Sequence, residues 1–261
     1  MPKRKINNIN IYYEITGEGE PLLLIHGLGS SIRDWEKQVP VFSEKYQVIT
    51  IDIRGHGKTD KPKESYTIPL FGEDIAELMK LLDINQVNIL GISLGGSIAF
   101  QFAVDYPEMV KSLVIVNTGV EFKLDSFKAR YNFFMRKLIV SLVGMKKMGE
   151  VLAPKLFIKP EQEDLRQKLI ERWAENDKKA YLNALKSLKD WTVKDHIHTI
   201  KCPVLVISSD EDYTPVSVKE EYTALIPNGD VKVIHDARHA VTMEKPSEFN
   251  KIVMDFLSEH S

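Results

Sequence analysis

One serine in this chain stands where residue types and spacing are those of a nucleophile. The apolar run from Val87 to Leu90 leads into Gly91-Ile92-Ser93-Leu94-Gly95-Gly96, and a helix-compatible segment follows. This order predicts a strand, an abrupt turn with Ser93 at its tip, and a helix, with glycines where chain segments pass closely. The free amides of a helix N-terminus favour a developing oxyanion. Because Gly-x-Ser-x-Gly also arises by chance, the interpretation requires a base, an acid and further oxyanion donors.

Histidine is the usual base for a serine hydroxyl, which is a poor nucleophile on its own. Of the seven histidines, His239 follows the last expected strand. A loop there lies at the carboxyl edge of the sheet, where sites in open α/β sheets are found. His235 falls within or at the end of that strand, and His196 and His198 suit solvated positions. The sequence therefore predicts His239 as the base.

A carboxylate must orient that histidine and stabilise its charged form. The apolar run from Val204 to Ile207 is followed by a loop that contains Asp210, Glu211 and Asp212. We predict Asp212, because two or three loop residues are needed to turn a carboxylate toward the histidine loop. Asp210 is the alternative.

Two backbone amides are expected to bind the oxyanion. One belongs to Leu94, directly after the serine. The other is assigned to Leu28, in the segment His26-Gly27-Leu28-Gly29 after a short apolar strand. Taken alone this segment reads as a tight turn, and only the serine motif favours the functional interpretation. The cluster Asp52-Ile53-Arg54-Gly55-His56-Gly57 is interpreted as bracing for a sharp turn.

Strands that alternate with helices predict an α/β fold, with a mostly parallel twisted sheet and helices on both faces. Residues 119–196 break this rhythm, since they contain helical patterns and no convincing strand. We expect a helical cap or lid there, inserted into a core of residues 1–118 and 197–261, although packing alone also explains its apolar residues. The expected strands are 6–15, 22–25, 46–53, 87–90, 111–117, 203–208 and 230–235, and the expected helices are 35–43, 67–82, 97–106, 124–143, 161–176, 178–191, 215–226 and 246–258.

Composition narrows the class of protein. The chain of 261 residues has a net charge of −2, which gives no electrostatic case for binding nucleic acid or an anionic membrane. No apolar run is long enough to span a bilayer or to form a signal-peptide core, and a cytoplasmic location is expected. The single cysteine, Cys202, is interpreted as structural. Neither a metal site nor a cofactor motif is found, and the oligomeric state is not predicted.

Together, and in this order, the segments around Gly27, Asp52, Ser93, Asp212 and His239 resemble the motifs of the α/β-hydrolase fold family. The resemblance covers nearly the whole chain, and is strongest to small carboxylesterases, pimeloyl-carrier methyl ester esterases and lactonases such as 3-oxoadipate enol-lactonase. It implies a cap between the sixth and seventh core strands. It also implies that Gly27 and Trp35 lie near the substrate pocket. A serine at position 93 argues against haloalkane dehalogenases, whose nucleophile is aspartate.

The expected activity is hydrolysis of a small-molecule carboxylic ester, lactone or thioester by a Ser93–His239–Asp212 triad through an acyl-enzyme. An acyltransferase or perhydrolase would use the same intermediate. A ligand-binding protein without catalysis is the non-enzymatic alternative. The motifs specify the fold more sharply than the reaction, because this fold supports many chemistries.

Overall fold

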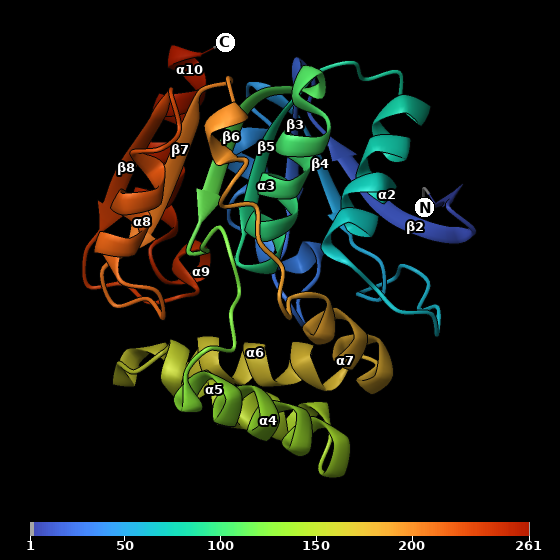
Figure 1. Cartoon of the computed structure of the whole chain (residues 1–261), viewed down its shortest axis with the longest axis vertical. Coiled ribbons are helices and arrows are strands. Elements are labelled where there is room, and N and C mark those ends of the chain that lie inside the picture. Colours follow the sequence, from blue (N-terminus) through green and yellow to red (C-terminus); the bar gives the residue numbers. More distant parts are fainter. Residues whose placement is uncertain (1–2, 261) are drawn as a thin grey trace.

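A computed structural model describes residues 3–260, and its centre is an eight-stranded sheet (Figure 1). The strands are β1 (Lys3–Ile6), β2 (Ile9–Thr16), β3 (Glu20–Ile25), β4 (Tyr46–Asp52), β5 (Val87–Ile92), β6 (Val110–Val116), β7 (Val204–Ser209) and β8 (Gly229–Ile234). Their order across the sheet is β1-β2-β4-β3-β5-β6-β7-β8. The β1–β2 and β2–β4 pairs are antiparallel, and every pair from β4 to β8 is parallel. The predicted fold class is confirmed.

Helices cover both faces of the sheet, because alternate strand residues point to opposite sides. On β3, Leu23 and Ile25 belong to the apolar cluster under α2 and α3, whereas Leu22 and Leu24 belong to the cluster under α1 and α10. All four side chains are fully buried, as expected for a strand covered on both faces. The helices around the sheet are α1 (Val39–Phe42), α2 (Ile68–Leu81), α3 (Leu94–Asp105), α8 (Val216–Thr223), α9 (Val241–Glu244) and α10 (Pro246–Glu259), with the 3₁₀ turns η1 (Ile32–Trp35), η2 (Pro107–Met109) and η4 (Ile197–Thr199).

Between β6 and β7 the chain forms four helices, here called the helical layer, which lie across the end of the sheet where the parallel strands finish (Figure 1). They pack on a small apolar cluster of their own, with Phe157, Trp173 and Tyr181 among its members. The sequence did not predict α5, which begins after Gly144 (φ 100°) and contains Pro154. The helical layer consists of α4 (Phe127–Leu142), α5 (Met145–Leu156), η3 (Pro160–Gln162), α6 (Glu163–Ala174) and α7 (Lys178–Ser187).

Two expected elements differ in detail from the structure. The single strand predicted over 6–15 is a hairpin of β1 and β2, because Asn7 and Asn8 adopt positive φ angles of 45° and 64°. Asparagine tolerates this left-handed backbone and suits a two-residue hairpin turn. The helix predicted over 35–43 is the 3₁₀ turn η1 followed by the four-residue α1.

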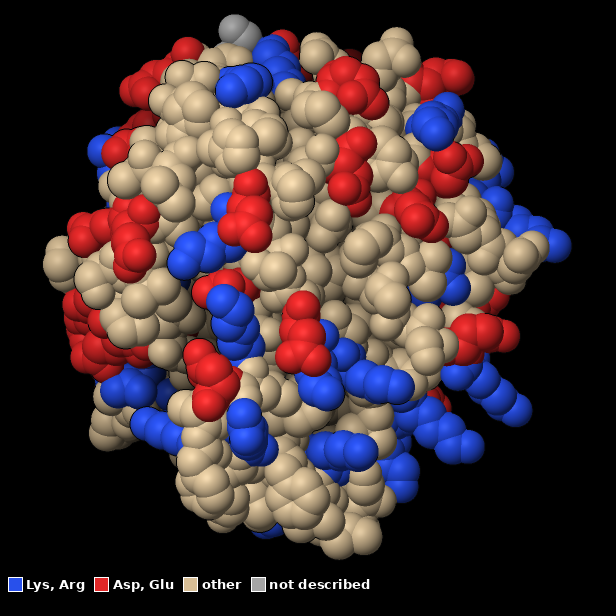
Figure 2. Space-filling model, viewed as in Figure 1, with Lys and Arg blue, Asp and Glu red and all other residues tan. Residues whose placement is uncertain are grey.

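Charged side chains of both signs are interspersed over the sheet part of the surface in Figure 2, and basic side chains are prominent over the helical layer at the bottom. Among residues 3–260, none of the helices combines the length and apolarity needed to cross a bilayer.

Candidate active site

Ser93 occupies the turn between β5 and α3. Its backbone angles, φ 56° and ψ −118°, lie where a residue with a side chain is strained. The neighbouring glycines make the turn possible, because a Cβ on Gly91 would lie 2.3 Å from the Gly95 carbonyl oxygen, and one on Gly95 would lie 2.1 Å from that of Ile25. Larger side chains at either position would push α3 away from the sheet.

His239 and Asp212 are in direct contact. His239 Nδ1 lies 2.6 Å from Asp212 Oδ1, and the Asp212 side chain is fully buried while that of His239 is 20% exposed. Burial acts to raise the pKa of the Asp212 carboxyl, but the hydrogen bond and charge of His239, with the charge of Lys219, hold that pKa below its usual value. The ring of Tyr213 packs on the imidazole, with 4.6 Å between centroids. The pair joins the loops after β7 and β8.

Asp210, the alternative acid, has a different position. Its carboxylate accepts hydrogen bonds from the backbone amides of Asp236 (3.1 Å) and Ala237 (3.2 Å), and it lies 3.2 Å from His235 Nδ1. These bonds brace the start of the loop that carries His239. The geometry therefore favours Asp212 as the partner of the histidine.

Lys219, on α8, is a member of this cluster that sequence reasoning missed. Its ammonium lies 2.6 Å from Asp212 Oδ2, and both side chains are fully buried. The ammonium also donates to Ser208 Oγ at 3.1 Å and to the Thr214 carbonyl at 3.0 Å. Burial lowers the pKa of Lys219, and the charge of Asp212 acts against that effect. The sequence signal is weak, because a lysine in a short helix ordinarily faces water.

Asn117, at the end of β6, is a second missed residue. Its side-chain amide donates to Ser209 Oγ at 2.8 Å and to the His239 carbonyl at 3.1 Å, and its Oδ1 accepts from the Ser209 amide at 2.8 Å. One side chain thus connects the ends of β6 and β7 to the histidine loop. Asparagine suits this place also because its φ is 46°. The sequence signal is weak, because an asparagine after a strand ordinarily suits a turn.

The predicted oxyanion loop is held by His26. Its Nδ1 donates to the Gly27 carbonyl at 2.8 Å, and its Nε2 accepts from the Ile53 amide at 3.2 Å. Burial lowers the pKa of His26 to about 4, so the imidazole is neutral and fits both roles. Within the described chain, the Leu28 amide has no acceptor. The Leu94 amide lies at the first position of α3, where no preceding helical carbonyl is available.

The predicted bracing cluster forms a buried network at the end of β4. Arg54 makes two hydrogen bonds of 2.7 Å to the carboxylate of Asp74, and both side chains are nearly inaccessible. Asp52 accepts from the Ile32 amide at 2.8 Å and from the Lys58 amide at 2.7 Å. These bonds fix the loop beside η1, as the sequence predicted.

A cavity of about 280 Å³ lies between the sheet edge and the helical layer. Trp35 forms part of its wall, and this indole N–H has no hydrogen-bond partner among residues 3–260. Asp212 lies behind His239, outside the lining. The remaining predicted site residues all line the cavity: Gly27, Leu28, Trp35, Ser93, Leu94 and His239.

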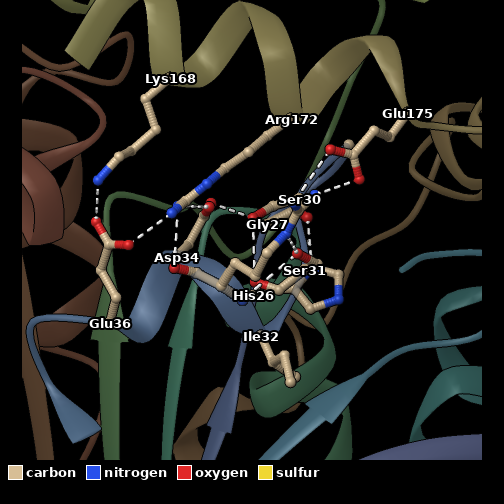
Figure 3. Close-up of polar contacts among 12 residues, drawn as sticks. His26, Gly27, Ser30, Ser31, Ile32, Asp34, Glu36, Lys168, Arg172 and Glu175 are labelled. Carbon is tan, nitrogen blue, oxygen red and sulfur yellow. Dashed lines mark hydrogen bonds and ion pairs between the residues drawn. The ribbon is translucent and has the colours of Figure 1, made fainter. Parts of the chain in front are cut away.

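The helical layer is fastened to the loop after β3 by charged side chains of α6 (Figure 3). Arg172 bonds to Asp34 at 3.1 Å and to Glu36 at 2.7 Å, and Lys168 bonds to the same Glu36 at 2.6 Å. We call these four residues the α6 contact. Asp34 also lines the cavity. The contact therefore joins α6 to the segment after β3 that carries both Leu28 and Asp34.

Other reactive groups are poorly placed for chemistry. Burial raises the pKa of the Cys202 thiol to about 11, which keeps it protonated near neutral pH. Within the described residues, His, Cys, Asp and Glu side chains do not gather in groups of three or more that suit a metal ion.

Comparisons with known proteins agree with the fold. Residues 20–139 match the family model of the alpha/beta hydrolase fold. The chain is 27% identical to 3-oxoadipate enol-lactonase 2 of Acinetobacter baylyi, over 94% of this chain and 92% of that protein. Its structure is similar to a thermophilic esterase from Thermogutta terrifontis (25% identity, TM-score 0.89, 100% and 99% of the two chains). It is also similar to a bromoperoxidase from Bacillus anthracis (26% identity, TM-score 0.90, 98% and 99% of the two chains).

Proposed function

Because this chain belongs to the α/β-hydrolase family, we propose that it is a serine hydrolase that cleaves carboxylic esters or lactones. One observation carries the proposal. Ser93, on a strained turn, and His239, held by the buried Asp212, line the same cavity. The enol-lactonase and esterase relatives support this class of reaction.

In the proposed mechanism His239 donates its Nδ1–H to Asp212, which leaves Nε2 free to accept the Ser93 proton. Ser93 Oγ forms a bond to the carbonyl carbon, and the amides of Leu28 and Leu94 bind the resulting oxyanion. Collapse breaks the bond to the leaving oxygen, which takes the proton from His239. Water then attacks the acyl-enzyme, with His239 again as base, and releases the acid and free Ser93.

The helical layer has a defined part in this proposal. We assign residues 119–196 as a cap and residues 1–118 with 197–261 as the catalytic core. The supporting observation is that α4, α5 and α6 supply cavity-lining side chains opposite Ser93, among them Arg136, Leu152 and Trp173. The cap then fixes which acyl or alcohol groups fit.

Perhydrolysis is a second candidate, favoured by the similarity to the bromoperoxidase. Hydrogen peroxide would attack the same acyl-enzyme in place of water and yield a peracid. Acyl transfer to an alcohol would use the same intermediate. Product analysis with peroxide or an alcohol present separates these outcomes from hydrolysis.

Replacement of the serine tests the proposal directly. We expect Ser93→Ala to lower kcat/KM for p-nitrophenyl acetate by about 10³-fold or more, because the covalent step is lost. Ser97→Ala is the matched control, since Ser97 also lines the cavity, and its hydroxyl contacts the Thr118 hydroxyl at 3.3 Å and the Ser93 backbone carbonyl at 3.5 Å but not the Ser93 hydroxyl. It should remain within about threefold of wild type, as expected for a small change away from the reacting atoms. Equal activity of wild type and Ser93→Ala would refute the assignment.

A further inference from the structure

Arg136, on α4, is a cation in the cavity that the proposed mechanism does not use. Its guanidinium lies 5.7 Å from the ring centroid of Trp173 and 5.6 Å from that of Tyr181, and its Nε donates to the Tyr181 hydroxyl. The two rings meet edge to face, with 5.6 Å between centroids. This arrangement holds the guanidinium plane against the inner side of the helical layer.

The guanidinium has no carboxylate partner within residues 3–260, and its two terminal nitrogens meet no acceptor there. Two acidic residues line the cavity, but each has its own cation. Asp34 bonds to Arg172 at 3.1 Å, and Glu121 bonds to Lys123 at 2.7 Å. Arg136 is therefore the unbalanced charge of the cavity.

Arg136 lines the same cavity as Ser93, Tyr213 and His239. Burial raises the pKa of the Tyr213 phenol, and the largest opposing effect is the positive charge of Arg136. Tyr213 in turn packs on the imidazole of His239. A substrate held between Arg136 and Ser93 would therefore pass beside the proposed base.

A carboxylate is the group that this arrangement suits. Arginine binds carboxylates through two parallel N–H donors, and its aromatic neighbours fix the fork in advance. An unpaired cation in a partly apolar cavity also carries a desolvation cost that an anion offsets. The volume of about 280 Å³ lies just below the usual range of ligand pockets, roughly 300–1,000 Å³, so it favours a small ligand.

We propose that Arg136 binds a carboxylate on the substrate, remote from the scissile carbonyl, so that the enzyme acts on small anionic esters or lactones. Monoesters of short dicarboxylic acids represent this class. The proposal rests on the proposed serine-hydrolase function. Basic residues also outnumber acidic ones within 119–196, whereas the whole chain has 35 Lys and Arg against 37 Asp and Glu. That excess over the helical layer (Figure 2) favours the approach of anions.

A matched pair of substrates tests the proposal. Monomethyl glutarate and methyl pentanoate are methyl esters of similar length, and only the first carries a carboxylate. We expect wild type to prefer monomethyl glutarate by about tenfold or more in kcat/KM, which corresponds to about 1.4 kcal/mol. Arg136→Met should remove that preference, because kcat/KM for monomethyl glutarate should fall by at least about fivefold more than any change for methyl pentanoate, as expected when the carboxylate contact is lost.

Arg130→Met is the control, since Arg130 lies exposed on the same helix, bonds to the Leu124 carbonyl and does not line the cavity. It should retain the preference. A wild type without preference for the anionic ester, or equal losses on both esters in Arg136→Met, would overturn the proposal.

A measurement of glutarate binding distinguishes the proposed carboxylate site from the proposed serine-hydrolase function. Glutarate should raise the melting temperature of wild type and of Ser93→Ala, but not that of Arg136→Met. If no ester is hydrolysed yet glutarate stabilises the chain through Arg136, the proposed function fails and the carboxylate site stands. If Ser93-dependent hydrolysis is found without a charge preference and without stabilisation by glutarate, only the carboxylate site fails.

Discussion

The polar groups behind His239 and those of the α6 contact are both networks of charge, yet they differ in their access to water. Asp212 and Lys219 have fully buried side chains. In the α6 contact, Arg172 is 13% exposed and its partners Asp34 and Glu36 are 28% and 35% exposed (Figure 3). Ions in water screen exposed pairs, whereas buried pairs interact through a medium of low polarity.

The difference teaches how the two networks act. A buried pair is costly to break, because the remaining charge has no water, so the Asp212 carboxylate has a fixed position. Pairs that water still reaches contribute less to stability than buried ones, so the α6 contact holds the helical layer more weakly than Lys219 holds Asp212. The Asp212–Lys219 pair is thus held rigidly, whereas the contact between α6 and the loop after β3 is weaker.

The largest decrease in activity is expected when the buried carboxylate of Asp212 is replaced by a neutral side chain. Asp212→Asn should lower kcat/KM for p-nitrophenyl acetate by about 10²–10⁴-fold, because the amide neither orients the imidazole correctly nor stabilises its charged form. Asp210→Asn is the comparison, since Asp210 braces the loop without contacting His239. The decrease of kcat/KM in Asp210→Asn should stay below about tenfold. A greater loss in Asp210→Asn than in Asp212→Asn would reverse the choice of acid.

Replacement of Lys219 is expected to have an intermediate effect, which should be seen in the pH dependence of kcat/KM. The ammonium beside Asp212 opposes the positive charge that His239 gains on protonation. Its removal in Lys219→Met stabilises the imidazolium, so the acid limb of kcat/KM should move to higher pH by about one unit. Lys219→Arg retains the charge and should move the limb less.

Folding of both Lys219 variants is checked by circular dichroism and thermal unfolding, so that a loss of activity through unfolding is recognised. An unshifted acid limb in a folded Lys219→Met would show that the lysine only fills space. A shift toward lower pH would contradict the electrostatic explanation.

The smallest effect is expected at the α6 contact. Arg172→Met should lower the free energy of unfolding by about 1 kcal/mol, because water still reaches the ion pairs that it breaks. It should also speed hydrogen exchange in α6, because the helix loses its bonds to Asp34 and Glu36. Wild type in about 1 M NaCl, where the screening length is about 3 Å, should approach the exchange of the variant. A loss of stability as large as that from breaking a buried pair would erase the contrast between the networks.

Much of the fold and of the candidate site could be predicted, because the signals are local. Apolar runs of four to seven residues separated by helical patterns predict a parallel sheet, and its carboxyl edge then collects the loops that follow the strands. Ser93 could be singled out because Gly91 and Gly95 are needed where backbones nearly touch. Asp212 and His239 followed from their places after the last two strands.

Other features could not be predicted, because they depend on which elements meet. Asn117 directly follows β6, and Lys219 and Arg136 lie on α8 and α4. Nothing in their neighbouring residues marks them. Lysine and arginine usually face water, so only the packing of α8 places Lys219 against Asp212 in the interior. The sequence by itself determined the strand–turn–helix around Ser93, and it placed the proposed acid and base in the loops after the last two strands. Only the tertiary structure decided the partners of those groups and the charge of the cavity, because pairing and burial depend on contacts between distant segments.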